Sequence, residues 1–469
     1  MRMADGRLVE RLRQYLRDLS PEARALLMTE LERGVLRGED MPGAELVLQE
    51  LRRDARDNAR PKRPGNLARL FFQPLEPILV DESGTHCHPG RVPRTVLDPV
   101  WEWICRDLMP GEAKAVTDQV ALAFQNGDAP RAEQLARAFQ DRAVVRIEEA
   151  LAAAKTDEKT TRRLVGQVGT PHAIDDISAI LTVIQAREIL ASFGPSLPNH
   201  IKTLDDSNID SLKATIESPA AGGRTLFVFV LVMTMGRLAA PWQLIRLATR
   251  AAGSDNASRI ADTPYAMTVD IVLGEIQRMI NELKAELRSG RGLAVGALLK
   301  GIHDAARGLR TEINFSHESP WGRRLAALRT QVSDLLKGEI ETLPGRIRRL
   351  LRPRPIKEIA PNSSLDQTDV SDTEAQIEFV NTCRAHASEL ALSELTTRTW
   401  SEIEQYLDTA TAALVENLRV AGESDRAFRQ SQLDAAVRFC RKAFGDDYAA
   451  LLLKARDVAA GAERRVAKA

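Results

Sequence analysis

This sequence has few aromatic residues and few cysteines, and it has no excess of either charge. Aromatic residues make up 4% of its 469 residues, whereas Ala, Leu, Arg and Glu are abundant. Sheets are rich in aromatic and β-branched residues, and Ala, Leu, Arg and Glu favour helices. We therefore predict an all-α fold, built as a multi-helix bundle or an irregular helical array, with little or no β-sheet.

The charges balance, with 65 basic and 65 acidic residues. A protein that binds nucleic acid or an anionic membrane through its overall charge would carry a basic excess. The sequence therefore predicts no nucleic-acid partner, and any membrane contact would have to be local.

Cysteines are few and scattered. Cys87, Cys105, Cys383 and Cys440 lie far apart and form no CxxC pair. Such spacing is typical of free thiols in a reducing compartment. The N-terminus carries charged residues in an amphipathic pattern, without the apolar core of a secretory signal. We expect a cytoplasmic protein.

A long hydrophobic run is also missing. The most apolar stretch, Leu226–Met235, is about half of the roughly 20 residues that a helix needs to cross a bilayer. Extending it would include Arg237 and Pro241, and an arginine near the middle of a span costs about 2.5 to 3.5 kcal/mol. We therefore predict that residues 225–248 form a buried apolar helix in the centre of the protein.

This interpretation can be checked at four residues. Val228, Leu231, Val232 and Met235 should be almost completely buried. The alternative is peripheral or re-entrant membrane association through residues 225–248, with help from the basic stretch 346–357.

Prolines and polar stretches divide the chain. Five prolines between positions 74 and 99 are too closely spaced for a long helix, so residues 71–99 are predicted to be irregular, with short strands or extended loops. Residues 360–372 are polar and acidic, as in a linker. The predicted order is an N-terminal helical unit at 1–59, a basic and proline-rich connector at 60–100, a central helical domain at 101–352, an acidic polar linker at 353–373 and a C-terminal helical unit at 374–469.

Two helices have faces suited to packing against another helix. Apolar residues three and four apart predict one helix from about Pro264 to Arg288 and a long helix or kinked pair from Thr373 to about Val420. The faces consist of Val269, Val272, Ile276, Met279 and Leu283 in the first, and of Trp400, Ile403, Leu407 and Leu414 in the second. These faces could pack internally or bind a partner.

His86, Cys87 and His88 form the only local cluster of metal-ligating residue types in the sequence. On an extended segment residues 86 and 88 point to the same side. A zinc site needs three or four ligands, however, and no CxxC or HxxxH pair accompanies the cluster. We interpret it as an ordinary solvated loop, with a metal-dependent enzyme that uses this loop as an alternative. No metal ligand is assigned.

Residues 218–225 resemble a phosphate-binding loop only superficially. Gly223-Arg224-Thr225 stands where Gly-Lys-Thr would, but Ser218 replaces the first glycine and a helix is predicted to precede the segment. A flexible entry into the apolar helix explains these glycines better. The glycines at 292, 296 and 301 match no dinucleotide fingerprint, and we expect them to permit close helix packing or to weaken their helix.

No catalytic motif is present, and we assign no catalytic residue and no cofactor. A chain rich in helix faces and poor in polar motifs is typical of proteins that act by contact. We therefore expect a non-catalytic scaffold or regulatory interaction protein, which binds a protein partner or forms a homo-oligomer through helix faces.

Overall fold

The structure is a computed structural model that describes most of the chain. The described residues are 66–81, 89–170, 172–218, 223–289, 294–316, 318–361 and 363–466, with a few isolated residues between 16 and 51. Apart from those few, the predicted N-terminal helical unit at 1–59 lies outside the described residues. Where it is described, the fold is all-α with one minimal strand pair, which confirms the predicted fold class.

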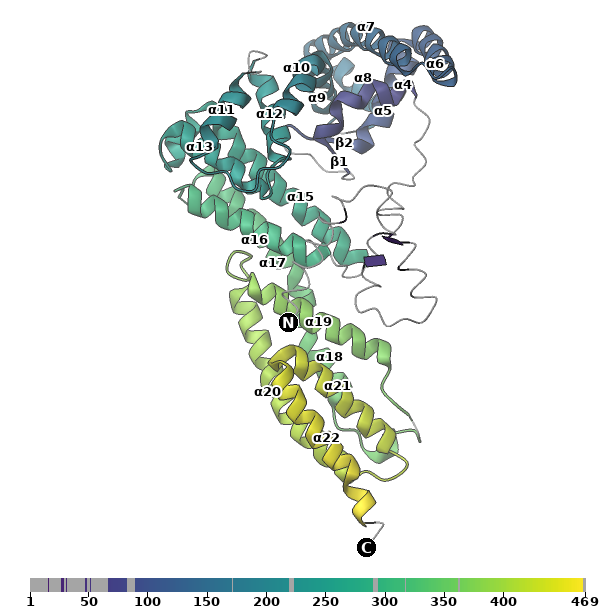
Figure 1. Ribbon diagram of the computed structural model, residues 1–469, viewed down its shortest axis with the longest axis vertical. Coiled ribbons are helices and arrows are strands. Elements are labelled where there is room, and N and C mark those ends of the chain that lie inside the picture. The colour runs from purple at the N-terminus through teal and green to yellow at the C-terminus, as the bar shows by residue number, and fades with distance from the viewer. Residues whose placement is uncertain are drawn as a thin grey trace. The chain divides into compact units, whose positions relative to one another are not determined.

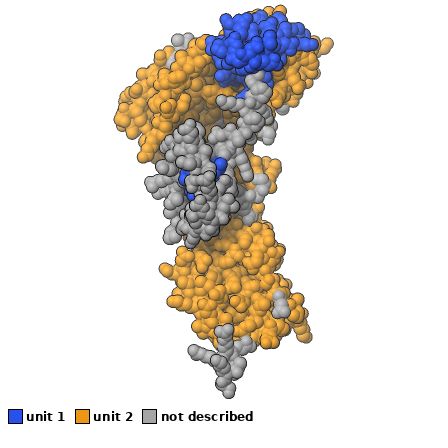
Figure 2. Space-filling model, turned by 45° about the vertical axis from the view of Figure 1, so that its right-hand side comes forward, with its two compact units in different colours: residues 1–73, 109–143 blue, residues 74–108, 144–469 orange. Residues whose placement is uncertain are grey.

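The chain divides into two compact units (Figure 2). One comprises residues 1–73 and 109–143, and the other comprises residues 74–108 and 144–469. The described elements of the first unit are α4 (Leu67–Phe72), α6 (Pro110–Gln125) and the first half of α7 (Ala129–Thr156). Phe71 and Phe139 pack edge to face there, with ring centroids 5.9 Å apart.

The remaining elements follow one another with short breaks (Figure 1). In chain order they are η1 (Gln73–Ile78), β1 (Leu79–Val80), β2 (Val92–Pro93), η2 (Arg94–Val96), α5 (Leu97–Trp103), η3 (Ile104–Leu108), α8 (Glu158–Val168), α9 (Ala173–Gln185), α10 (Arg187–Ser196), α11 (Ile209–Glu217), α12 (Arg224–Met235), η5 (Pro241–Leu244), α13 (Ile245–Ala252), α14 (Ala257–Ala261), η6 (Pro264–Ala266), α15 (Met267–Ser289), α16 (Ala294–Glu312), α17 (Pro320–Glu341), α18 (Leu343–Leu351), η7 (Ile356–Glu358), α19 (Gln367–Ala385), α20 (Ser393–Arg419), α21 (Arg426–Phe444) and α22 (Asp446–Val466).

The proline-rich segment contains the strands that the sequence predicted. β1 and β2 pair in parallel, with Leu79 opposite Val92 and Val80 opposite Pro93. The Arg94 guanidinium joins the two sides of this segment, at 3.0 Å from Glu76 and 2.8 Å from Asp81. Regular structure is more extensive than expected, since η1 precedes β1 and α5 already begins at Leu97.

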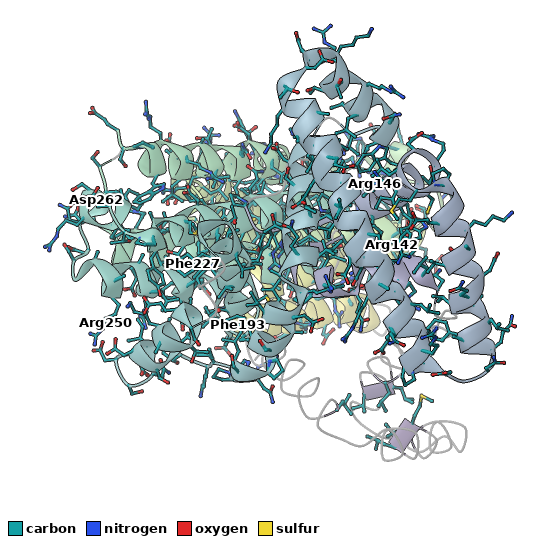
Figure 3. All side chains as sticks on the ribbon, turned by 90° about the horizontal axis from the view of Figure 1, so that it is seen from above. Arg142, Arg146, Phe193, Phe227, Arg250 and Asp262 are labelled. Atoms are coloured by element: carbon teal, nitrogen blue, oxygen red, sulfur yellow. The ribbon has the colours of Figure 1, made fainter. Side chains whose placement is uncertain are left out.

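The apolar helix α12 is buried. Leu231 and Val232 are completely buried and Met235 is 2% exposed, as predicted. The prediction was wrong for Val228, which is half-buried. Its Cγ2 packs closely on the backbone of Gly90, where an added Cβ would lie 3.0 Å away, and the rest of the side chain stays partly exposed. In Figure 3 the Phe227 side chain lies among the teal helices, and its ring meets Tyr265 edge to face at 5.0 Å.

The apolar segment 225–248 is divided into more than one helix. α12 ends at Met235, and the chain then makes an isolated bridge between Ile201 and Leu238 before η5 begins at Pro241. Among the described helices, none is by itself long and apolar enough to cross a membrane, whereas α9 and α10 together reach that length and composition but are bent by 72°.

The predicted face on α15 packs internally. Val269, Val272, Ile276 and Leu283 are buried, and α15 lies against α16 and α17 (Figure 1). Gly301 of α16 permits close packing, because a Cβ there would lie 2.9 Å from the sulfur of Met279. This confirms one of the expected glycine contacts. At Gly296, by contrast, an added Cβ would have no described neighbouring atom within 4 Å.

The face predicted on α20 is also internal. Trp400, Ile403, Leu407 and Leu414 are buried, and α20 packs against α21 and α22. Ion pairs join these helices and their neighbours: Arg348–Glu402 at 2.6 Å, Arg349–Asp369 at 3.4 Å, Arg438–Glu374 at 2.6 Å, Lys442–Glu378 at 2.6 Å and Arg398–Glu341 at 3.2 Å. Part of the basic stretch 346–357 is therefore paired within the protein.

Helix α19 begins inside the segment that the sequence predicted to be a linker. Asp366 caps it by accepting a hydrogen bond from the Thr368 backbone amide at 2.8 Å. Leu365 is buried beside α21, and its amide donates to Ser431 Oγ at 3.0 Å. The sequence proposed one long helix or a kinked pair here, and the structure shows two helices, α19 and α20, separated by a turn.

Buried glutamines bind the carbonyl ends of helices. Gln140 Nε2 donates to the Phe71 carbonyl at 2.8 Å, Gln376 Nε2 to the Glu339 carbonyl at 2.7 Å, and Gln432 Nε2 to the Leu350 carbonyl at 3.0 Å. The last carbonyls of a helix have no partner inside the helix. These three amides therefore stabilise the ends of α4, α17 and α18.

Gly308 should be the less replaceable of two glycines in α16. A Cβ at Gly308 would lie 2.3 Å from Cε3 of Trp242, so Gly308→Ala should displace that ring and lower the free energy of unfolding by about 1 to 3 kcal/mol. Gly296→Ala is the matched control in the same helix, and should raise it by up to about 1 kcal/mol through helix propensity. Urea unfolding followed by circular dichroism measures both. Equal effects of the two substitutions would contradict the packing role of Gly308.

Candidate functional site

The loops that the sequence singles out form no described site. His86, Cys87 and His88 lie outside the described residues, so the metal hypothesis for that loop stays a prediction. Among the residues that are described, no group of three or more His, Cys, Asp or Glu side chains could hold a metal ion.

The glycine-containing segment 218–225 is described only at Ser218 and residues 223–225. Gly223 has a φ of 93°, which glycine adopts without strain, and it directly precedes α12. In the helix that precedes this segment, Glu217 accepts a hydrogen bond from the Tyr265 hydroxyl at 3.2 Å, and Lys213 lies 2.7 Å from the same carboxylate. Burial raises the pKa of Tyr265, and the neighbouring Glu217 charge adds to this. These contacts join α11 to η6, the short helix before α15, which is a packing role.

Several polar side chains of α16 and α17 converge on the turn between α19 and α20, residues 386–391. We call this segment the α19–α20 turn. Arg329 of α17 donates from Nε to the Glu389 carbonyl at 2.7 Å and from Nη2 to the Ser388 carbonyl at 2.8 Å. Ser333 donates to the Ala391 carbonyl at 3.2 Å. Three carbonyls of one turn are thus bound by one helix.

Helix α16 binds the same turn through charge. Arg310 Nη1 lies 2.9 Å from Oε2 of Glu389, whose side chain is 13% exposed. The turn itself is held in an unusual conformation, since Ala391 has a φ of 55°, in the left-handed region that non-glycine residues rarely adopt. Such strain persists only where the surroundings hold the backbone in place. The contacts from Arg310, Arg329 and Ser333 provide those surroundings.

A histidine pair lies at the start of the turn. The rings of His303 in α16 and His386 have centroids 5.0 Å apart, and His303 Nδ1 lies 3.1 Å from Oδ1 of Asp304. Burial lowers the pKa of His386, repulsion from His303 and Lys300 lowers it further, and Asp304 acts in the opposite direction. The pair therefore packs best while His386 is neutral.

A pocket of about 360 Å³ opens beside these arginines. It is lined by Asp255, Arg310, Thr311, Ile313, Asn314, Phe315, Gly322, Leu325, Ala326 and Arg329. The loop before α14 and the segment after α16 form one wall, because the Asn314 amide donates to the Asp255 carbonyl at 2.8 Å and the Ala257 amide donates to the Asn314 carbonyl at 3.3 Å. Helix α17 contributes the other wall. Its volume lies near the lower end of the range of small-molecule sites, and the pocket is open to solvent on one side.

Sequence reasoning did not find this site. Its charged residues are spread over the chain from Asp255 to Glu389 and form no motif. The nearest signal in the sequence is Ser319–Pro320, because a capping residue followed by proline is typical of a helix start, and this pair precedes the helix that carries Arg329. The structure confirms that start, since Ser319 Oγ accepts a hydrogen bond from the Gly322 amide at 3.1 Å.

The sequence matches no protein-family model, and the comparisons with curated proteins and with solved structures found no match. The function therefore has to be argued from the residues of this chain.

Stability should fall in mild acid because of His386. Its pKa is lowered in the folded protein, whereas an unfolded histidine titrates near about 6.5. Neutral His386 therefore contributes full stability above pH about 6.5, and this contribution is lost as the pH falls through the lower folded-state pKa. His386→Gln should flatten the loss of unfolding free energy between pH 7.5 and pH 5.5, measured by urea unfolding.

The control for this measurement is His200→Gln, at an exposed histidine away from the turn. It should keep the pH dependence of the unchanged protein. If His386→Gln and His200→Gln behave alike, the histidine pair does not contribute to acid sensitivity.

Proposed function

We propose that this chain is a non-catalytic cytoplasmic helical protein that acts through protein–protein contacts, as a scaffold or regulatory interaction protein. The faces first considered for a partner, on α15 and α20, serve the core. A partner must therefore bind elsewhere, and the contact proposed here joins two copies of the chain along α22.

The outer face of α22 is the observation that carries this proposal. Leu451 and Val458 are 67% and 69% exposed and lie seven residues apart, on one side of the helix. The opposite side carries Ala449, Leu452 and Ala459, which are buried. Helix α22 packs on α20 and α21 with that second side. Two large apolar side chains on one exposed stripe are what a partner helix covers.

The charges beside this stripe suit a second copy of the same helix. Asp447 and Lys454 are exposed, and neither forms an ion pair with any residue in the described part of the chain. They lie four residues before and three residues after Leu451, on the same face. In an antiparallel pair of α22 helices with a two-fold axis near Leu451, Asp447 of each copy lies opposite Lys454 of the other. The pair would bury both leucines and form two ion pairs.

The three described cysteines form no disulfide, which is what the proposed reducing compartment predicts. Cys105, Cys383 and Cys440 are free thiols. Burial raises the pKa of Cys383 and of Cys440 to about 12. Both stay protonated at neutral pH and are protected from oxidation, because the thiolate is the reactive form.

The contact can be tested by measuring the molar mass of the protein and of variants in which the charges of Asp447 and Lys454 are reversed. We expect a dimer by multi-angle light scattering and sedimentation, and a monomer for Leu451→Glu, which places a charge in the apolar stripe. Asp447→Lys and Lys454→Asp should each weaken the dimer about tenfold or more by setting like charges together. The double variant should restore it, because the pairing is then reversed.

Leu122→Glu is the matched control, since Leu122 is a single exposed leucine of α6, 57% exposed. It should leave the dimer unchanged. A protein that is monomeric at every concentration, or a Leu451→Glu variant that stays dimeric, would overturn the α22 contact. If pull-downs from the native cell also recovered no partner, the scaffold function would fail with it.

A further inference from the structure

The pocket beside the α19–α20 turn contains two opposite charges that do not pair with each other. Arg329 binds only the neutral carbonyls of Ser388 and Glu389, and forms no ion pair within the described residues. Asp255 lines the same pocket, and its carboxylate has no hydrogen bond or ion pair in the described chain. Arg310 differs, because Glu389 balances its charge.

The guanidinium of Arg329 has donors left over. Its Nε and Nη2 are used by the turn, while the N–H groups of Nη1 take part in neither bond. A guanidinium carries five N–H donors in a fixed plane, and a carboxylate is its natural partner. Because the turn holds one edge of Arg329 in place, the remaining edge is oriented in advance for an anionic group.

Three apolar residues, Ile313, Phe315 and Leu325, line the pocket together with the two charged residues. Ile313 and Leu325 are 2% and 3% exposed, so Phe315 is the apolar residue that a ligand can reach. A ligand that matches these residues has a carboxylate for Arg329, an ammonium group for Asp255 and an apolar part for Phe315. A volume of about 360 Å³ admits a molecule of that description only if it is small.

We propose that this pocket binds a small zwitterion of the amino-acid class, with its carboxylate on Arg329, its ammonium group on Asp255 and an apolar side chain against Phe315. This inference is independent of the α22 contact. Binding involves no covalent step, and the ligand is held by charge pairing at both ends.

Calorimetric titration and thermal unfolding of the full chain test the proposal, with the free apolar amino acids leucine, methionine and phenylalanine as probes. At least one should bind and raise the melting temperature. Its N-acetyl derivative, which lacks the ammonium group, and its amide, which lacks the carboxylate, should each bind at least tenfold more weakly.

Two pairs of variants locate the binding site. Asp255→Asn removes the acid, and Ala326→Asp places a carboxylate one helical turn before Arg329, where it neutralises the free guanidinium. Both should weaken binding tenfold or more. The controls are Asp262→Asn, at an exposed acid on the outer edge in Figure 3, and Ala327→Asp, at the next exposed residue of α17. Neither control position lines the pocket, and both variants should bind like the unchanged protein.

Three results would overturn the proposal. They are the absence of binding by all three probes, equal binding of the N-acetyl or amide derivative, and equal weakening by a pocket variant and its control. Because Asp255 and Ala326 are both exposed, their variants should fold, and circular dichroism of each variant confirms this before titration.

Discussion

Buried helix ends are the constraint on which the rest of this structure depends. The last carbonyls of each helix have no partner within the helix, and leaving one buried and unbound costs about 1 to 3 kcal/mol. A chain of many short helices has many such ends. Gln376 and Gln432 bind helix ends that lie 37 and 82 residues away along the chain. Each contact fixes the position of one helix against another while removing an unsatisfied carbonyl.

The α19–α20 turn shows the same constraint in a more exposed place. Its carbonyls are bound by Arg329 and Ser333 in place of a glutamine. An amide is neutral and adds no charge to its surroundings, whereas a guanidinium that binds carbonyls keeps its full charge. The requirement to satisfy a turn therefore leaves a cation at the edge of a pocket. Asp255 also lines this pocket, and the two residues give it opposite charges.

The apolar residues of α12 and the exposed apolar residues of α22 have different roles. Helix α12 is apolar on nearly every side and is surrounded by protein, so its residues stabilise the core. Helix α22 is amphipathic, and its inner side is occupied by small residues such as Ala449 and Ala459. Large apolar residues that the core does not use, Leu451 and Val458, remain on its outer side. The apolar surface that a partner can bind is thus on α22, which is the less apolar of these two helices.

Local patterns predicted much of the fold. The spacing of apolar residues located α15, and Ser319 before Pro320 located the start of α17, because helix periodicity and capping involve residues only a few positions apart. The same patterns identified α12 as buried. They did not place the turn between α19 and α20 or the early start of α19, where Asp366 caps a segment whose composition resembles a linker.

The sequence by itself determined that this protein is helical, that most of residues 226–235 are core and where several helices begin. Only the tertiary structure decided that the faces on α15 and α20 are internal, that Arg310 is balanced by Glu389 and that Arg329 and Asp255 line one pocket without pairing. The physical reason is distance along the chain. Propensity and capping act within one or two turns, whereas charge balance depends on side chains that packing brings together from positions tens of residues apart.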